Sequence, residues 1–204
     1  EFPKSLKILA IGNSFSTDSM QYLYQIMKDG GVEEIVLGNL YYGGCSLDQH
    51  MSFAKADSAS YKYYKNTTGE WKVTENYKMS QALADEKWDY VSLQQTSKTC
   101  GLTNSYGRLD DMIDIVKKAC PDTKLIWNMT WAYQQDSTHS SFPNYDKDQM
   151  KMYNMIINVV NEVITPLNFD IMIPCMTSIQ NARTSVMGDT LTRDGYHMDY
   201  YIGR

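Results

Sequence analysis

The sequence predicts a single α/β domain, residues 1–204, in which helices cover both faces of a parallel β-sheet. Three observations predict it. Short aliphatic runs alternate with longer segments of helical periodicity. The runs are nearly continuous in apolar residues, as is typical of parallel strands buried on both faces. Hydrophobic residues make up 43% of the chain, which is sufficient for one sizeable core.

Five short apolar runs have the composition of buried strands. The first ends at Gly12, and each of the others is bounded by polar residues, Gly or Pro. The runs are three to six residues long, which favours strands over buried helices. The expected strands are 6–11, 35–37, 89–93, 124–129 and 170–174.

Four segments between these runs carry apolar residues at helical spacing. Gly30-Gly31 stops the first, Pro121 marks the end of the third, and Pro166 follows the fourth. We therefore expect helices at 18–29, 76–86, 105–119 and 146–164, and a polar segment at 175–204.

Residues 50–75 are polar and rich in tyrosine, and they resemble an insertion between two units of the sheet. Asn66-Thr67-Thr68-Gly69 is a typical turn sequence, and 71–73 is a candidate short strand.

Composition excludes several classes of function. The formal net charge is -5 and no basic patch is present, which argues against nucleic acid as a partner. No apolar run is long enough for a membrane span. The four cysteines are widely spaced without a Cys-x-x-Cys pair, which favours free thiols over a metal site. We expect neither a cofactor nor a metal.

Ser14 follows the first expected strand in the segment Gly12-Asn13-Ser14-Phe15-Ser16. Ligands of parallel sheets bind at the carboxyl ends of the strands, so a serine there can act as a nucleophile. Its own amide can stabilise an oxyanion. The alternative interpretation is a simple helix N-cap.

Two further pairs follow the second and third strands. Gly43-Gly44 can present bare amides to a ligand, although a simple turn has the same composition. Gln94-Gln95 can offer a side-chain amide to an oxyanion, or can merely begin a polar loop.

Asp194 and His197 stand three residues apart near the C-terminus. A carboxylate at this spacing can fix the imidazole tautomer, so that the other ring nitrogen faces a nucleophile. A surface ion pair without a role is the alternative.

Together these segments resemble the SGNH (GDSL-type) esterase superfamily, in particular a poorly characterised bacterial branch. Gly12-Asn13-Ser14-Phe15-Ser16 is similar to its first block, Gly43 or Gly44 to its second-block glycine, and Asp194-Gly195-Tyr196-His197 to its Asp-x-x-His block. The resemblance implies a three-layer α/β/α, flavodoxin-like fold with five parallel strands in the order 2-1-3-4-5.

The sequence departs from the family pattern in three places. Asn13 replaces the aspartate of the first block, and Gln94-Gln95-Thr96-Ser97 replaces Gly-x-Asn-Asp in the third. The family normally places a helix after the catalytic histidine, whereas seven residues follow His197 here. We therefore expect that the C-terminal helix is truncated.

The resemblance implies a serine esterase that hydrolyses small acyl esters, mainly acetyl esters, of small molecules or carbohydrates. Ser14, His197 and Asp194 would form the triad. Ser14, Gly44 and Gln95, or alternatively Gly43 and Gln94, would bind the oxyanion. The residues expected to contact substrate are Asn13, Tyr42 and Trp131.

Two other functions fit the sequence. A catalytically inactive carbohydrate-binding protein could keep the same fold, a possibility raised by the altered third block. A metal-dependent hydrolase would need His50, His139 and His197, which lack ligand spacing. The carbohydrate analogy favours an exported protein, in the periplasm or outside the cell or as a lipoprotein, whose leader is absent from this sequence.

Overall fold

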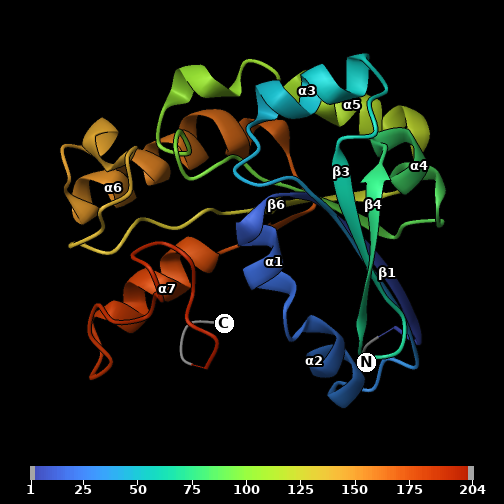
Figure 1. Ribbon diagram of the computed structural model, residues 1–204, viewed down its shortest axis with the longest axis horizontal. Helices are drawn as coiled ribbons and strands as arrows, with labels where there is room; N and C mark the ends of the chain where they lie inside the picture. The colour runs from blue at the N-terminus through green and yellow to red at the C-terminus, as the bar shows by residue number, and fades with distance from the viewer. Residues whose placement is uncertain (1–2, 202–204) are drawn as a thin grey trace.

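The computed structural model describes residues 3–201 and confirms an α/β fold around one central sheet (Figure 1). The sheet has seven strands in the order β4-β3-β2-β1-β5-β6-β7. Strands β2, β1, β5, β6 and β7 are parallel, in the predicted order. The strands are β1 Ser5–Gly12, β2 Glu34–Tyr41, β3 Tyr61–Asn66, β4 Trp71–Tyr77, β5 Tyr90–Leu93, β6 Lys124–Asn128 and β7 Ile171–Ile173.

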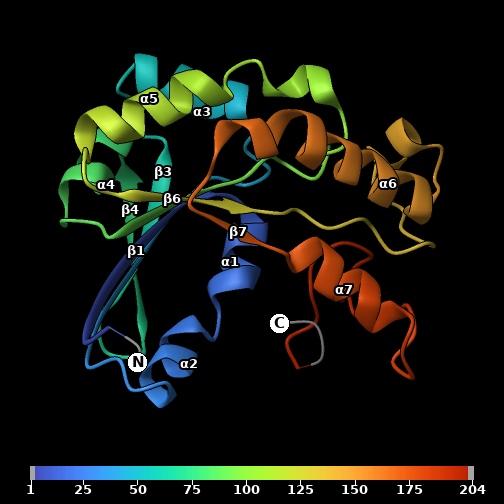
Figure 2. The ribbon, with the colours of Figure 1, turned by 180° about the vertical axis from the view of Figure 1, so that it is seen from behind.

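Helices cover both faces of the sheet, as Figures 1 and 2 show from opposite sides. Helices α3 to α6 lie over one face, and α1, α2 and α7 over the other. The α-helices are α1 Ser14–Met20, α2 Leu23–Asp29, α3 Leu47–Lys55, α4 Met79–Ala84, α5 Leu109–Ala119, α6 Gln149–Val159 and α7 Cys175–Arg183. Short helical turns are η1 Thr103–Tyr106, η2 Phe142–Tyr145, the π-type η3 Val160–Ile164 and η4 Thr165–Leu167.

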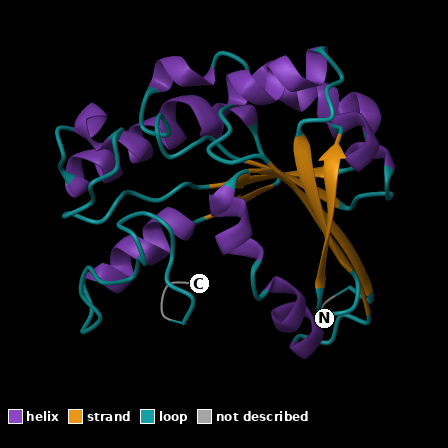
Figure 3. Cartoon of the chain, in the orientation of Figure 1, coloured by secondary structure: helices purple, strands orange, loops and turns teal. Residues whose placement is uncertain are grey.

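The sheet is two strands wider than predicted, because β3 and β4 form an antiparallel hairpin beside β2 (Figure 3). The prediction missed β3 because tyrosines, not aliphatic residues, supply its buried positions. Tyr61 and Tyr63 are 1% and 3% exposed, while Lys62 between them points to solvent. The expected turn at 66–69 joins the two strands, and the Asn66 side chain accepts hydrogen bonds from Thr68 N and Gly69 N.

Two helical predictions need correction. The helix expected at 18–29 is two helices, and the first begins earlier, at Ser14. Helix α7 was expected as a polar segment. Its buried positions include Gln180 and Arg183, so the apolar stripe that reveals an amphipathic helix is missing from its sequence.

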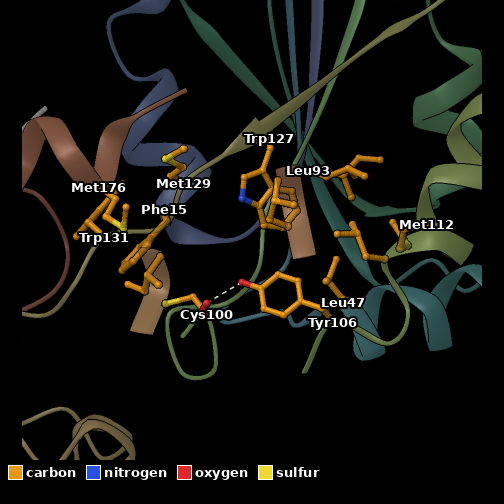
Figure 4. Packing of buried hydrophobic residues seen from close by; sticks show 14 of the residues in the cluster. Phe15, Leu47, Leu93, Cys100, Tyr106, Met112, Trp127, Met129, Trp131 and Met176 are labelled. Carbon is orange, nitrogen blue, oxygen red and sulfur yellow. Dashed lines mark hydrogen bonds between the residues drawn. The ribbon is translucent and has the colours of Figure 1, made fainter. Parts of the chain in front are cut away.

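The main core lies between the sheet and helices α3 to α6, and it reaches the carboxyl edge of the sheet (Figure 4). There Phe15 stacks on Trp131, with ring centroids 4.1 Å apart and the planes 9° from parallel. Gly38 in β2 allows Trp88 and Tyr63 to approach the strand, because a Cβ at residue 38 would lie 2.9 Å from an atom of each. The rigid core thus extends to the first residues after β1.

Two predictions about the chain's chemistry can be compared with this fold. All four cysteines are free thiols, Cys45 and Cys100 fully buried and Cys120 and Cys175 partly so. No helix within residues 3–201 has the length and apolar character needed to cross a lipid bilayer.

Candidate active site

The carboxyl ends of β1, β2, β5 and β6 lie side by side at one edge of the sheet. The chain leaves these ends through Asn13-Ser14, Tyr42-Gly43-Gly44, Gln94-Gln95 and 129–133 respectively. The fold therefore gathers at one edge four segments that are up to about 120 residues apart in sequence, as expected for the ligand-binding edge of a parallel sheet.

Ser14 is the first residue of α1, directly after the turn that ends β1. Asn13 is the N-cap: its Oδ1 accepts a hydrogen bond from Phe15 N at 3.0 Å, and its Nδ2 donates to Cys45 O at 3.1 Å. The cap fixes the turn against the segment that follows β2. Ser14 itself is half-buried, so its hydroxyl can reach both protein and solvent.

A continuous chain of hydrogen bonds joins Ser14, His197 and Asp194. Ser14 Oγ lies 2.7 Å from His197 Nε2, and His197 Nδ1 lies 2.6 Å from Asp194 Oδ2. Asp194 Oδ1 also accepts the backbone N–H of His197 at 2.8 Å. The carboxylate therefore holds both the ring and the backbone of the histidine, with the second ring nitrogen facing the serine.

The loop that carries His197 is tied to two other parts of the fold. Thr192 and Met198 form an antiparallel bridge at its base. Met198 N donates to the buried Asp18 Oδ2 at 2.9 Å, which joins the loop to α1. Trp131 Nε1 donates to Tyr196 O at 2.8 Å, which joins it to the segment after β6. These bonds pre-position the imidazole over the first turn of α1.

The Asp194 carboxylate is held in its ionised form. Burial by itself would raise the pKa of Asp194, but the hydrogen bonds that it accepts from His197 outweigh this effect and hold its pKa below the usual value. A carboxylate that stays charged can orient the imidazole and stabilise an imidazolium.

The turn after β2 presents backbone donors to this edge. Gly44 adopts a left-handed conformation, φ 63°, which glycine accepts without strain. Within residues 3–201, the amides of Ser14, Gly43 and Gly44 donate to no backbone or side-chain acceptor. Three N–H groups in the segments at this edge thus have no acceptor within the described residues.

The side chains of the two glutamines expected as oxyanion donors form hydrogen bonds with neighbouring loops. Gln95 Nε2 donates to Ser105 O at 2.8 Å and to Ser105 Oγ at 3.1 Å, so this side-chain amide is engaged within the protein. Gln94 Nε2 donates to Asn13 Oδ1 at 2.8 Å. The third-block glutamines therefore brace the loops of the site.

The residues expected to contact substrate also occupy different environments. Asn13 is 2% exposed and serves as the cap described above, and Trp131 is 1% exposed. Because Phe15 covers one face of the Trp131 ring and the core surrounds the rest, Trp131 offers no face to a sugar ring. Tyr42 alone of the three is partly exposed. Its ring packs edge-on with that of Phe53, with the two ring centroids 4.9 Å apart.

The three histidines do not converge on one point. His50 is fully buried, where its Nδ1 lies 2.9 Å from Tyr61 OH, and burial lowers its pKa to about 3. His139 is near His197, since both rings contact Tyr196, with centroids at 4.7 and 4.2 Å. No group of three metal-ligating side chains occurs in the part of the chain that the structure describes.

We expect Asn13→Asp to destabilise the protein by about 1–3 kcal/mol at neutral pH. The change removes the N–H donated to Cys45 O and places a buried carboxylate oxygen against that carbonyl. The matched control is Asn154→Asp at an exposed position of α6, where we expect a change within about 0.5 kcal/mol. Urea unfolding of both variants measures this; an unchanged midpoint for Asn13→Asp would show that the Nδ2 bond is not formed.

A mixed sheet with five parallel strands in this order, covered by helices on both faces, defines an α/β fold that solved SGNH hydrolases share. Residues 7–204 match the family described as Domain of unknown function (DUF4886), and the chain belongs to that family. A comparison with curated proteins finds no match.

Solved structures agree with this assignment. The crystal structure of a DUF4886 family protein from Bacteroides uniformis ATCC 8492 is similar with a TM-score of 0.93 and 41% identity, over 98% of this chain and 78% of that one. A proposed SGNH hydrolase from Slackia heliotrinireducens has a TM-score of 0.57 at 18% identity, over 96% and 91%. An acetyl xylan esterase has a TM-score of 0.54 at 12% identity, over 95% and 92%. The two distant likenesses concern the fold.

Proposed function

We propose that this protein is a serine esterase of the SGNH superfamily, with Ser14 as nucleophile, His197 as base and Asp194 as the residue that orients the base. One observation carries the proposal: the unbroken hydrogen-bond chain from Asp194 Oδ2 through His197 to Ser14 Oγ, with distances of 2.6 and 2.7 Å. The likeness of the fold to SGNH hydrolases and to an acetyl xylan esterase supports it.

The geometry supports a two-step acyl transfer. His197 Nδ1–H donates a hydrogen bond to the Asp194 carboxylate and keeps its proton, so that Nε2 accepts the proton of Ser14 as Oγ attacks the ester carbonyl. The imidazolium then protonates the departing alcohol. Water, deprotonated by the same nitrogen, hydrolyses the acyl-enzyme and restores the serine.

Backbone amides would stabilise the oxyanion of each tetrahedral intermediate. The Ser14 amide lies at the first turn of α1 and the Gly44 amide in the adjacent turn, and neither has an acceptor within residues 3–201. Removing one such donor typically costs about 10²–10³ in rate. Gln94 and Gln95 would hold the surrounding loops in place, through Asn13 and Ser105 respectively.

We propose that the substrates are small acyl esters, mainly acetyl esters, of a small alcohol or a carbohydrate. Around the serine the free donors are main-chain amides of a tight turn, and the neighbouring large rings of Phe15 and Trp131 are buried. Acetate release from acetylated xylan, compared with hydrolysis of 4-nitrophenyl esters from acetyl to decanoyl, tests this choice. Faster turnover of the decanoyl ester would exclude it.

We expect Asp194→Asn to reduce kcat for 4-nitrophenyl acetate by about 10⁴-fold. The amide would favour the wrong imidazole tautomer and could not stabilise the imidazolium. Asp136→Asn, at an exposed position on a nearby loop, is the control and should retain activity. Steady-state kinetics of the two variants checks the role; an Asp194→Asn enzyme within tenfold of the parent would exclude it.

A further inference from the structure

Lys98 is a basic residue of this edge that the proposed mechanism does not use. The chain reaches it directly after the third-block segment 94–97, which follows β5. A Cβ added to Gly44 would lie 3.0 Å from Lys98 Nζ and 3.4 Å from its Cε. The lysine side chain therefore lies against the turn whose amides have no acceptor.

The backbone of Lys98 is fixed while its side chain is exposed. Its carbonyl oxygen accepts hydrogen bonds from Asn144 Nδ2 at 3.1 Å and from Tyr145 OH at 3.3 Å. Tyr145 is completely buried, so this anchor belongs to the core. The ammonium group extends from a fixed point into solvent beside the site.

No carboxylate within residues 3–201 forms an ion pair with Lys98. Arg193 and Arg183, two other cations on the segments around the site, are paired: Arg193 lies 3.4 Å from Asp18, and Arg183 lies 2.9 Å from Asp189. The charge of Lys98 is therefore available to an anion that enters the site.

His139 provides a neutral donor in the same neighbourhood. Its Nδ1 accepts the N–H of Ser141 at 3.1 Å, which leaves the ring proton on Nε2. Burial lowers the pKa of His139, and the electrostatic effects of nearby Lys98 and His197 lower it further against the opposing effect of Asp194. The His139 ring also lies 4.6 Å from the ring of Tyr133, whose hydroxyl donates to Ser97 Oγ, the residue before Lys98, at 3.1 Å.

We propose that Lys98, assisted by the Nε2–H of His139, selects esters that carry a carboxylate close to the scissile bond. This inference rests on the proposed esterase function and names its substrate class. One ammonium and one neutral N–H fit a monoanion; a phosphate group normally receives several charged or forked donors. The carboxylate can belong to the acyl group or to the alcohol, and the two sources need separate substrates.

The test compares two matched pairs of esters. 4-Nitrophenyl hemisuccinate and 4-nitrophenyl butyrate differ by a carboxylate on the acyl side, and 3-acetoxybenzoate and phenyl acetate by a carboxylate on the alcohol side. In one of the pairs we expect kcat/KM to be about tenfold higher for the anionic ester at low salt. This preference should shrink as ionic strength rises, because the Debye length falls from about 30 Å at 0.01 M to about 10 Å at 0.1 M.

Lys98→Met should abolish this preference while leaving kcat/KM for the neutral ester within about twofold, and Lys98→Arg should retain it. Lys118→Met is the matched control, since Lys118 is also exposed but lies near the end of α5, on the amino side of β6. If Lys98→Met lowers kcat/KM equally for the neutral and the anionic ester, the proposal is overturned, because this would indicate a general effect on catalysis. An unchanged preference would overturn it as well.

A binding measurement separates this proposal from the esterase function. Ser14→Ala protein, titrated with monomethyl succinate and with methyl butyrate, should show tighter binding of the anion in NMR chemical-shift titrations. The added Lys98→Met change should remove the difference. Anion-selective binding without any turnover by the parent enzyme would refute the esterase function alone, whereas turnover without anion selectivity would refute the role of Lys98 alone.

Discussion

Ser14→Ala is expected to lower kcat for 4-nitrophenyl acetate by about 10⁶-fold, to the rate that binding and backbone amides alone provide. The substitution removes the only hydroxyl within hydrogen-bond distance of His197 Nε2, among the residues that the structure describes. The imidazole then has no nucleophile to deprotonate.

Ser14→Ala should leave the fold intact, because Asn13, not Ser14, supplies the N-cap of α1. The free energy of unfolding, measured by thermal denaturation, should therefore change by no more than about 0.5 kcal/mol. Ser19→Ala is the control for loss of a hydroxyl elsewhere on α1, where the serine donates to Phe15 O at 2.9 Å. Full activity in Ser14→Ala, or equal losses in the two variants, would contradict the proposed nucleophile.

Trp131→Ala is expected to destabilise the protein by about 3–5 kcal/mol. The indole is 1% exposed, stacks on Phe15 at 4.1 Å and holds the His197 loop through Tyr196 O. Its removal leaves a large cavity directly behind helix α1. Activity at temperatures where the variant remains folded should also fall, because the loop loses one of its anchors.

Trp131→Phe separates the two contributions of this side chain. The phenyl ring can keep the stack on Phe15, whereas the hydrogen bond to Tyr196 O is lost, at a cost of about 1 kcal/mol. Guanidinium unfolding monitored by far-ultraviolet circular dichroism measures both variants. A loss below about 1 kcal/mol in Trp131→Ala would contradict a buried, packed indole.

The central part of the fold could be predicted from the sequence because its signals are local. The five parallel strands are short aliphatic runs, and β1, β5, β6 and β7 lie within one residue of the predicted bounds at every end. Their order, with the carboxyl ends at one edge, follows from the family resemblance and the rules of parallel sheets. The family resemblance, rather than these rules, predicted that the segments carrying Ser14 and His197, 183 residues apart, lie at one place.

The elements that the sequence did not reveal depend on tertiary contacts. Strand β3 buries tyrosines whose hydrogen-bond partners are remote in sequence. Tyr63 Oη, for example, donates to Asp85 Oδ2 at 2.7 Å. Helix α7 buries an arginine because Asp189 neutralises it. A polar residue becomes a core residue only when such a partner is supplied, and no local pattern indicates that.

The same limit applies to the site. Gln95 has the residue type of an oxyanion donor, but its donors are used by Ser105, which lies ten residues further along the chain. Trp131 lies in a loop, as a sugar platform would, yet Phe15 and the core bury it. The sequence does not indicate a role for Lys98, because a single lysine belongs to no recognisable motif. Its side chain comes close to Gly44 only in the folded chain.

Active-site labelling tests the central claim most directly. The folded protein, incubated with a fluorophosphonate, should gain the mass of one phosphonyl adduct, and peptide mapping should place it on Ser14. His197→Ala should slow the labelling by several orders of magnitude, since the hydroxyl is unreactive without its base. Absence of the adduct in the parent protein, or an adduct on another serine with Ser14 unmodified, would contradict the account.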